Sequence, residues 1–183
     1  MGGRTMMNHI EWIQSDPTLD TLESINDWEN VYLYLINLDY IHRTDTPVYL
    51  RGLTSNWYAL SEANLPDSHF EAFYSLFLHG VHHGRQNLYN DYRFLTLLGY
   101  MVSVSPHLFP NPLNATALLK QAEKLSNHNL FVHLLYLGSI GSSQTLPQYE
   151  AVKSEFSQSS YNWLVGNSAF ERYFREVLST SLL

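Results

Sequence analysis

Three histidines between positions 79 and 83 are the side chains of this 183-residue chain whose type and spacing come closest to a metal site. On a helix, His79 and His83 would lie one turn apart, where two imidazoles can share a zinc or iron ion. A third ligand is required, and the carboxylate of an H-E-x-x-H motif is missing because Gly80 follows His79. We therefore expect no cofactor and keep His79, His82 and His83 as weaker metal candidates. The alternative is a group of exposed polar residues near the end of a helix that stops at Gly84.

The composition argues against several other kinds of chemistry. The chain has no cysteine, which excludes disulfides, a thiol nucleophile and thiolate metal sites. It has no G-x-S-x-G nucleophile elbow and no glycine-rich phosphate loop. It also lacks an apolar run long enough for a signal peptide or a bilayer span. We expect a cytoplasmic protein that is not an enzyme, with no catalytic residues and no membrane contact.

Acidic residues are concentrated in the first quarter of the chain. Residues 1–45 contain eight acidic and two basic side chains, whereas residues 46–183 contain nine acidic and eight basic ones. This distribution argues against nucleic-acid binding and favours a basic protein partner that approaches the N-terminal helices. An aromatic ring among the carboxylates could serve as the anchor of such an interface. The alternative is a solvated face that only keeps the protein soluble. The candidate partner-binding residues are Asp16, Asp20, Glu23, Asp27, Trp28, Glu29, Asp39 and Asp45.

The periodicity of apolar residues predicts helices throughout. They recur at steps of three and four residues, period-two alternation is absent, and all seven prolines fall where the pattern breaks. We expect an all-α, single-domain helical bundle or stack of helical hairpins over residues 7–183, with residues 1–6 disordered or foreign to the native protein, whose translation would start near Met6 or Met7. The nine expected helices cover about 17–25, 27–43, 48–63, 68–84, 91–105, 114–125, 130–137, 147–156 and 168–178.

Two of these helices begin with the S-x-x-E pattern of a capping box. Ser68 with Glu71, and Ser168 with Glu171, are expected to satisfy each other's backbone N–H groups at a helix start. Both pairs precede apolar residues with helical spacing, which supports a helix beginning at each position.

A central segment of the chain carries a family resemblance. Residues 90–101 (NDYRFLTLLGYM) lead to residues 105–109 (SPHLF) within a small, acidic, cysteine-free helical sequence. In this character the chain resembles the helical immunity proteins of bacterial toxin systems, including contact-dependent growth inhibition. The resemblance implies a cytoplasmic inhibitor that binds one cognate toxin, often a basic nuclease, and covers its active site. These families share no binding motif, so the resemblance assigns no role to any residue.

Three classes of function therefore remain open at the level of the sequence. The leading expectation is an immunity protein that binds and neutralises a basic, nuclease-type toxin, because an acidic surface can imitate the nucleic acid that such a toxin holds. The second is a helical-repeat scaffold or adaptor, although no repeat of 33–47 residues aligns. The third is a histidine-dependent metalloprotein.

Overall fold

The computed structural model describes residues 12–158 and 166–180, and over these ranges the chain is helical, as the sequence predicted. The predicted N-terminal extension, residues 1–6, lies outside the described residues. Nine α-helices and two short 3₁₀ turns make up the regular structure of the described ranges, which contain no strand. The α-helices are α1 (Pro17–Ser24), α2 (Trp28–Leu38), α3 (Thr46–Ser61), α4 (Asp67–Asn87), α5 (Tyr92–Val104), α6 (Ala115–Leu125), α7 (Leu130–Ile140), α8 (Leu146–Gln158) and α9 (Ala169–Thr180), and the 3₁₀ turns are η1 (Tyr40–His42) and η2 (Pro106–Leu108).

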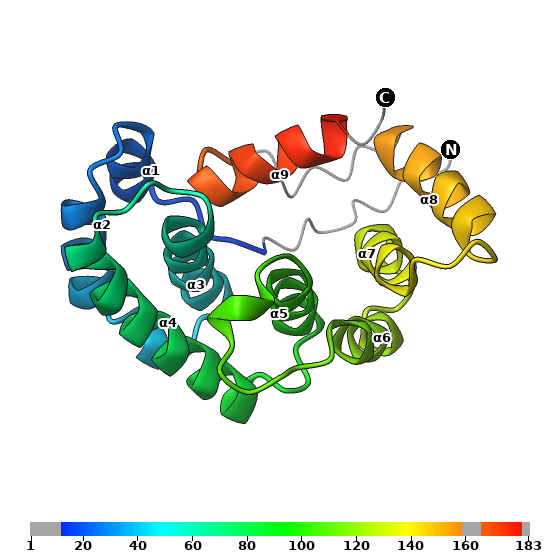
Figure 1. Ribbon diagram of the computed structural model, residues 1–183, viewed down its shortest axis with the longest axis horizontal. Helices are drawn as coiled ribbons and strands as arrows, with labels where there is room; N and C mark the ends of the chain where they lie inside the picture. The colour runs from blue at the N-terminus through cyan, green and yellow to red at the C-terminus, as the bar shows by residue number, and fades with distance from the viewer. Residues whose placement is uncertain (1–11, 159–165, 181–183) are drawn as a thin grey trace, which may run out of the picture.

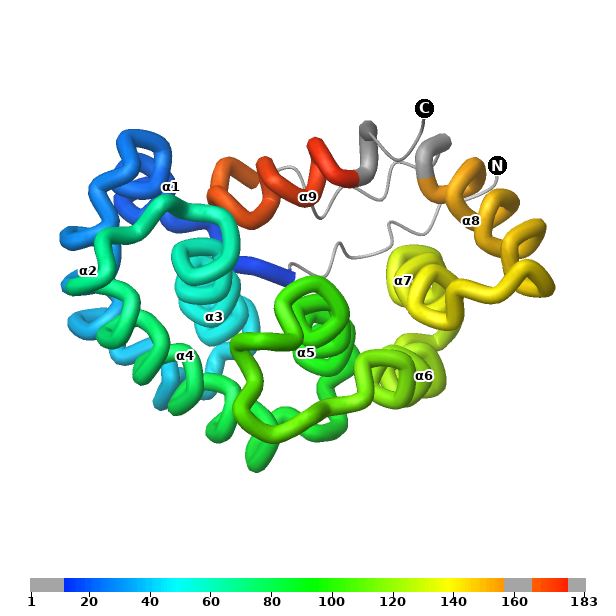
Figure 2. Tube along the Cα trace, in the orientation of Figure 1, coloured from blue at the N-terminus to red at the C-terminus, as the bar shows by residue number. Residues whose placement is uncertain are grey.

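Helices that follow one another in sequence pack against one another in space. Helix α1 contacts α2, α3 contacts α4, α5 contacts α6, α6 contacts α7, and α7 contacts α8. Figure 1 shows α1–α4 at one end of the molecule, α5 in the middle and α6–α8 at the other end. Helix α9 departs from this order, because it packs against α1 and α3 and extends back toward α8 (Figure 2). The arrangement is a row of helical hairpins with the last helix laid across it.

Aspartates begin four of the helices. Asp16, Asp27, Asp45 and Asp91 are the N-cap residues of α1, α2, α3 and α5. Each carboxylate accepts a hydrogen bond from a backbone N–H in the first turn, at 2.9–3.5 Å. A carboxylate at this position satisfies an N–H that has no partner inside the helix and interacts favourably with the helix dipole. Much of the N-terminal acidity therefore has a local structural role.

Two predicted helix ends are wrong, and tertiary packing gives the reason. The helix expected over 27–43 breaks at Asp39, which adopts a left-handed conformation with φ of 50° before η1. Helix α4 continues past Gly84 to Asn87. Gly84 lies against the Phe94 ring and the Tyr49 hydroxyl, where a Cβ would clash. This glycine permits close packing inside the helix and does not end it.

One predicted capping box forms and the other does not. In α9 the backbone N–H of Glu171 donates to Ser168 Oγ at 3.1 Å, and the N–H of Ser168 donates to Glu171 Oε2 at 3.3 Å, which confirms the prediction. Helix α4 instead starts one residue before Ser68, and its N-cap, Pro66, makes no side-chain capping bond. Proline holds the extended backbone that precedes this helix, so Ser68 and Glu71 lie within the first turns.

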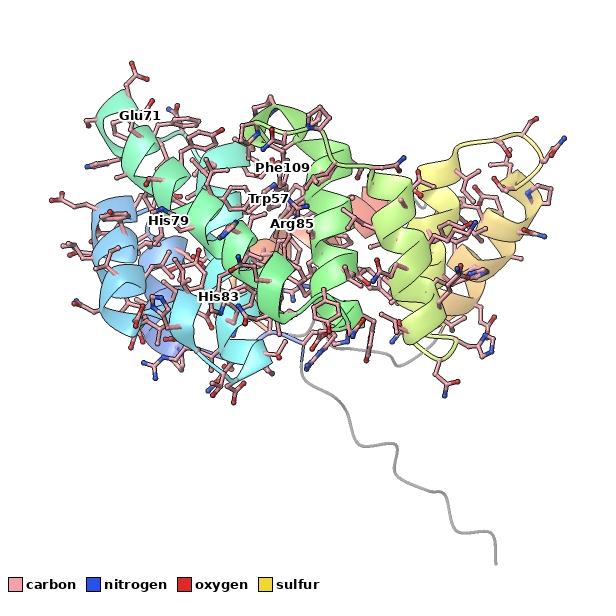
Figure 3. The ribbon with its side chains drawn as sticks, turned by 90° about the horizontal axis from the view of Figure 1, so that it is seen from below. Trp57, Glu71, His79, His83, Arg85 and Phe109 are labelled. Atoms are coloured by element: carbon pink, nitrogen blue, oxygen red, sulfur yellow. The ribbon has the colours of Figure 1, made fainter. Side chains whose placement is uncertain are left out.

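Trp57 lies at the centre of the aromatic core. Its fully buried ring meets Tyr100 of α5 and both Phe170 and Tyr173 of α9 edge to face, with centroids 5.7–6.0 Å apart. Edge-to-face pairs at this distance add to the stabilisation that burial provides. Figure 3 shows Trp57 in the interior of the molecule. These rings hold α3, α5 and α9 together.

A buried ion pair joins α1 to α3. The Arg51 side chain is 1% exposed, and its two terminal nitrogens donate to the two carboxylate oxygens of Glu23 at 2.8 and 3.0 Å. Arg51 also donates to Asp20 at 2.8 Å. Burial alone would lower the pKa of Arg51, but the carboxylates of Glu23 and Asp20 raise it above its ordinary value, so the guanidinium stays charged.

Glu23 extends the same network to α3 and α9. Its carboxylate also accepts hydrogen bonds from Ser55 Oγ at 2.6 Å and from the backbone N–H of Ala169 at 2.7 Å. Ala169 is the first residue of α9, so the carboxylate stands at the positive end of that helix. Every oxygen of Glu23 is therefore paired, as a buried charge requires.

We expect Arg51→Met to lower the free energy of unfolding by about 3–5 kcal/mol, because it leaves two buried or half-buried carboxylates without their cation. Urea denaturation followed by circular dichroism measures this change. Arg85→Met is the matched control, since Arg85 is exposed on α4, and it should change stability by about 0.5 kcal/mol or less. Equal effects of the two substitutions would contradict the importance of the buried pair.

Candidate partner-binding surface

Two of the predicted partner-binding acids belong to the interior network. Glu23 is 2% exposed and Asp20 is half-buried, and both carboxylates are bound to Arg51. The expectation that Glu23 lies on the surface is wrong. Leu19 and Glu23 occupy the same side of α1, one turn apart, and this side packs inward. Removing or reversing the charge of Glu23 or Asp20 would therefore change the stability of the fold more than it would change a binding surface.

Trp28 is also inside the protein. It is 6% exposed, and its ring stacks on Tyr58 of α3 with centroids 5.9 Å apart. The expectation that Trp28 is a projecting anchor is therefore wrong, because the ring already fills the α2–α3 contact. Only its edge reaches the surface, where it forms part of the wall of a cleft.

Asp27 and Glu29, which flank Trp28, line this cleft. It is about 510 Å³ in volume and is completed by Asn26 and by Asn64, Pro66 and His69 from the α3–α4 connection and the start of α4. No described lysine or arginine lines it. Asp27 caps α2 with one oxygen and accepts from the Asn30 side chain with the other, whereas Glu29 is exposed. Two carboxylates and two side-chain amides form a site suited to a cationic group.

Exposed apolar side chains adjoin the cleft. Ile25, directly before Asn26, is 64% exposed, and Leu33 and Ile36 of α2 are 50% and 46% exposed. Leu33 and Ile36 follow Glu29 at i+4 and i+7, so the three side chains form one stripe along the outer side of α2. We name the cleft together with Ile25, Leu33 and Ile36 the α2 surface. Carboxylates beside exposed apolar groups are typical of a protein-binding surface.

The three remaining predicted acids lie near the surface, outside the cleft. Asp16 caps α1 and accepts a hydrogen bond from the Tyr34 hydroxyl at 2.8 Å. Asp39 is exposed at the α2–η1 corner and pairs with His42 at 2.7 Å, and Asp45 is exposed at the start of α3. None of the three lines the cleft.

The histidines of α4 form a different cluster. His79 and His82 are exposed, while His83 is half-buried, with its ring 5.8 Å from that of His42 and 6.1 Å from that of Tyr49. Figure 3 shows His79, His83 and Arg85 following one another along α4. Across residues 12–158 and 166–180, no three histidine, aspartate or glutamate side chains lie close enough to hold a metal ion. Asp91, the acid nearest to the cluster in sequence, instead caps α5 and pairs with Arg93.

The residues that other elements contribute to the α2 surface were not predicted from the sequence. Asn64, Pro66 and His69 follow α3 in sequence, and no pattern in the chain indicates that they face α2. Arg51 was not predicted either, although a signal existed. Arg51 stands in α3 within an unbroken buried run from Tyr49 to Trp57, and a charged residue within such a run needs a buried partner.

Comparisons of the chain with models of protein families, with curated proteins and with solved structures find no match. Of the helices in the described parts of the chain, none combines the length and the apolar character that crossing a membrane requires.

We expect the folded state to lose stability as the pH falls through about 6.5, partly because of His83. Burial lowers the pKa of His83 from its ordinary value of 6.5, and the neighbouring His42 and His82 lower it further. At His83 the unfolded chain therefore binds a proton more readily than the folded chain does, and this favours unfolding as the pH falls. Urea denaturation at pH 7 and pH 5 should show a smaller loss of stability in His83→Gln than in the original protein. His107→Gln, at an exposed site on η2, should leave the loss unchanged, and a His83→Gln profile identical to that of the original would contradict the expectation.

We also expect that zinc does not stabilise the protein, because the α4 histidines have no third ligand among the described residues. The midpoint of thermal unfolding should be the same with EDTA and with one equivalent of zinc. An increase with zinc that His79→Ala abolishes would establish a metal site.

Proposed function

We propose that this chain is an immunity-type protein that binds a basic protein toxin through the α2 surface and neutralises it. One observation carries the proposal. Asp27 and Glu29 line a cleft that no described lysine or arginine shares. The exposed Ile25 precedes the cleft residues in sequence, and the exposed Leu33 and Ile36 follow Glu29 along the same side of α2.

The chemistry of this surface fits a partner that is itself built to hold phosphate. A nuclease carries lysine and arginine in its substrate groove, and the cleft beside Trp28 offers such a side chain two carboxylates and two amides. The apolar side chains of Ile25, Leu33 and Ile36 supply area whose burial slows dissociation, while the acids accelerate encounter. Binding of this kind covers the toxin's groove and excludes its substrate.

The proposal places the protein in the cytoplasm, where a toxin of this kind meets its substrate. The absence of cysteine is compatible with a reducing compartment. It includes no catalytic step, because inhibition by steric coverage needs only affinity.

The test uses the toxin domain that the proposal places in the product of the gene next to that of this chain. Bacteria that express this domain alone should stop growing, and co-expression of the chain should restore growth. The variant Asp27→Asn/Glu29→Gln should lose protection, because it removes both charges while asparagine still caps α2. Ile25→Ser tests the apolar contribution and should weaken protection without changing stability by more than about 0.5 kcal/mol.

The matched control is Glu150→Gln/Glu155→Gln, which removes two exposed charges from α8 at the opposite end of the molecule (Figure 1). It should protect as well as the original protein does. With purified proteins, Asp27→Asn/Glu29→Gln should slow association and reduce its dependence on salt, since the Debye length falls to about 8 Å at physiological ionic strength. Failure of the chain to protect, or equal protection by the two double variants, would refute the proposal.

A further inference from the structure

The cleft of the α2 surface collects polar side chains from two separate parts of the chain. Asn26, Asp27 and Glu29 come from the α1–α2 turn and the start of α2, and Asn64 comes from the α3–α4 connection. Each of these four side chains has an oxygen that can accept a hydrogen bond. A ligand in the cleft therefore meets acceptors contributed by both segments.

Most of these acceptors have no partner inside the described protein. Among the described residues, none forms a hydrogen bond or an ion pair with the side chain of Asn26, Glu29 or Asn64. The two carboxylate oxygens of Asp27 accept from the backbone N–H of Asn30 at 3.3 Å and from its side-chain amide at 2.8 Å, and each oxygen retains a second lone pair. The cleft can therefore offer a ligand several acceptors, two of which carry a negative charge.

Apolar surface lines the cleft together with these acceptors. Trp28, which is largely buried, and Pro66, which is exposed, supply it. Such surface disfavours an ion that must keep its hydration shell. A guanidinium is more weakly hydrated than an ammonium, so bringing a guanidinium into this cleft costs less free energy.

The arrangement of donors also distinguishes the two cationic side chains of proteins. Arginine has five N–H groups fixed in one plane, whereas the three of lysine converge on a single nitrogen. A guanidinium paired with Asp27 or Glu29 retains N–H groups that are directed elsewhere in the cleft, where the amide oxygen of Asn64 can accept one. An ammonium on the same carboxylate spans less of a cleft whose volume is about 510 Å³.

We propose that this cleft binds one arginine side chain of the partner, in preference to lysine. The guanidinium pairs with the carboxylates of Asp27 and Glu29 and also donates to the side-chain oxygen of Asn64. This inference rests on the proposed function, because it names the group of the basic partner that the α2 surface holds.

Two small probes test the preference without any toxin. N-acetyl-L-argininamide and N-acetyl-L-lysinamide are titrated into the full, isotope-labelled chain, and NMR follows the side-chain N–H signals of Asn26, Asn64 and Trp28. The arginine probe should bind saturably and about fivefold more tightly than the lysine probe, which is the effect of one further hydrogen bond. Equal affinities, a tighter lysine probe or the absence of saturable shifts would overturn the proposal.

Substitutions at exposed sites assign the contacts. Asn64→Ala should weaken binding of the arginine probe about fivefold, to the affinity of the lysine probe, and leave the lysine probe unchanged. Glu29→Gln should weaken both probes, because it removes a charge that both cations use. Asn111→Ala, at an exposed site after η2, is the matched control for Asn64→Ala and should change neither affinity. An arginine preference that Asn64→Ala leaves intact would overturn the bridging contact to Asn64.

The probe titration and the growth assay can fail independently. A chain that protects against the toxin but does not prefer the arginine probe refutes this inference alone. A chain that prefers the arginine probe but does not protect refutes the proposed function.

Discussion

The buried guanidinium of Arg51 sets the main constraint on this fold. A charge out of water costs several kcal/mol unless its partners surround it, and here those partners are Glu23 and Asp20 of α1. Glu23 is held in turn by Ser55 of α3 and by the first backbone N–H of α9. Helices α1, α3 and α9 therefore assemble around one ion pair. Separation of α1 from α3 would leave a buried charge unpaired, and a shift of α9 would remove one hydrogen bond from Glu23.

The same constraint changes the meaning of the acidic first quarter. Its described acids divide into two that neutralise Arg51, three that cap helices, and Glu29 and Asp39, which are exposed and do neither. Glu29 belongs to the last group, and Asp27 both caps α2 and lines the cleft. The exposed negative charge is thus more local than the net charge of the segment indicates. This charge lies near the exposed apolar side chains of α2.

The helical fold could be predicted from the sequence because the spacing of apolar residues, at steps of three and four, is a local property of each segment. The capping box at Ser168 could be predicted for the same reason. The break at Asp39 and the continuation of α4 past Gly84 could not be predicted, because they depend on residues distant in sequence. Tyr49 and Phe94 lie against Gly84, and Tyr40 of η1 lies against Gly52. At the candidate site, composition does not distinguish Glu23 from Glu29, because both are glutamates in the acidic first quarter of the chain. The position of Glu23 one turn after Leu19 was the available sign that it faces inward, whereas nothing local indicated that Asn64 and His69 would face α2.

The bond between Glu23 and Ala169 spans 146 positions of the chain, and it imposes an order on biosynthesis. Helices α1 and α3 emerge from the ribosome early and can form the Arg51 ion pair as soon as both are available. The fourth donor to Glu23 is made only after α8 has been translated, when α9 emerges. Until then Trp57 lacks the rings of Phe170 and Tyr173, and Tyr100 lacks the ring of Phe174, so these aromatic surfaces stay uncovered until α9 packs against them.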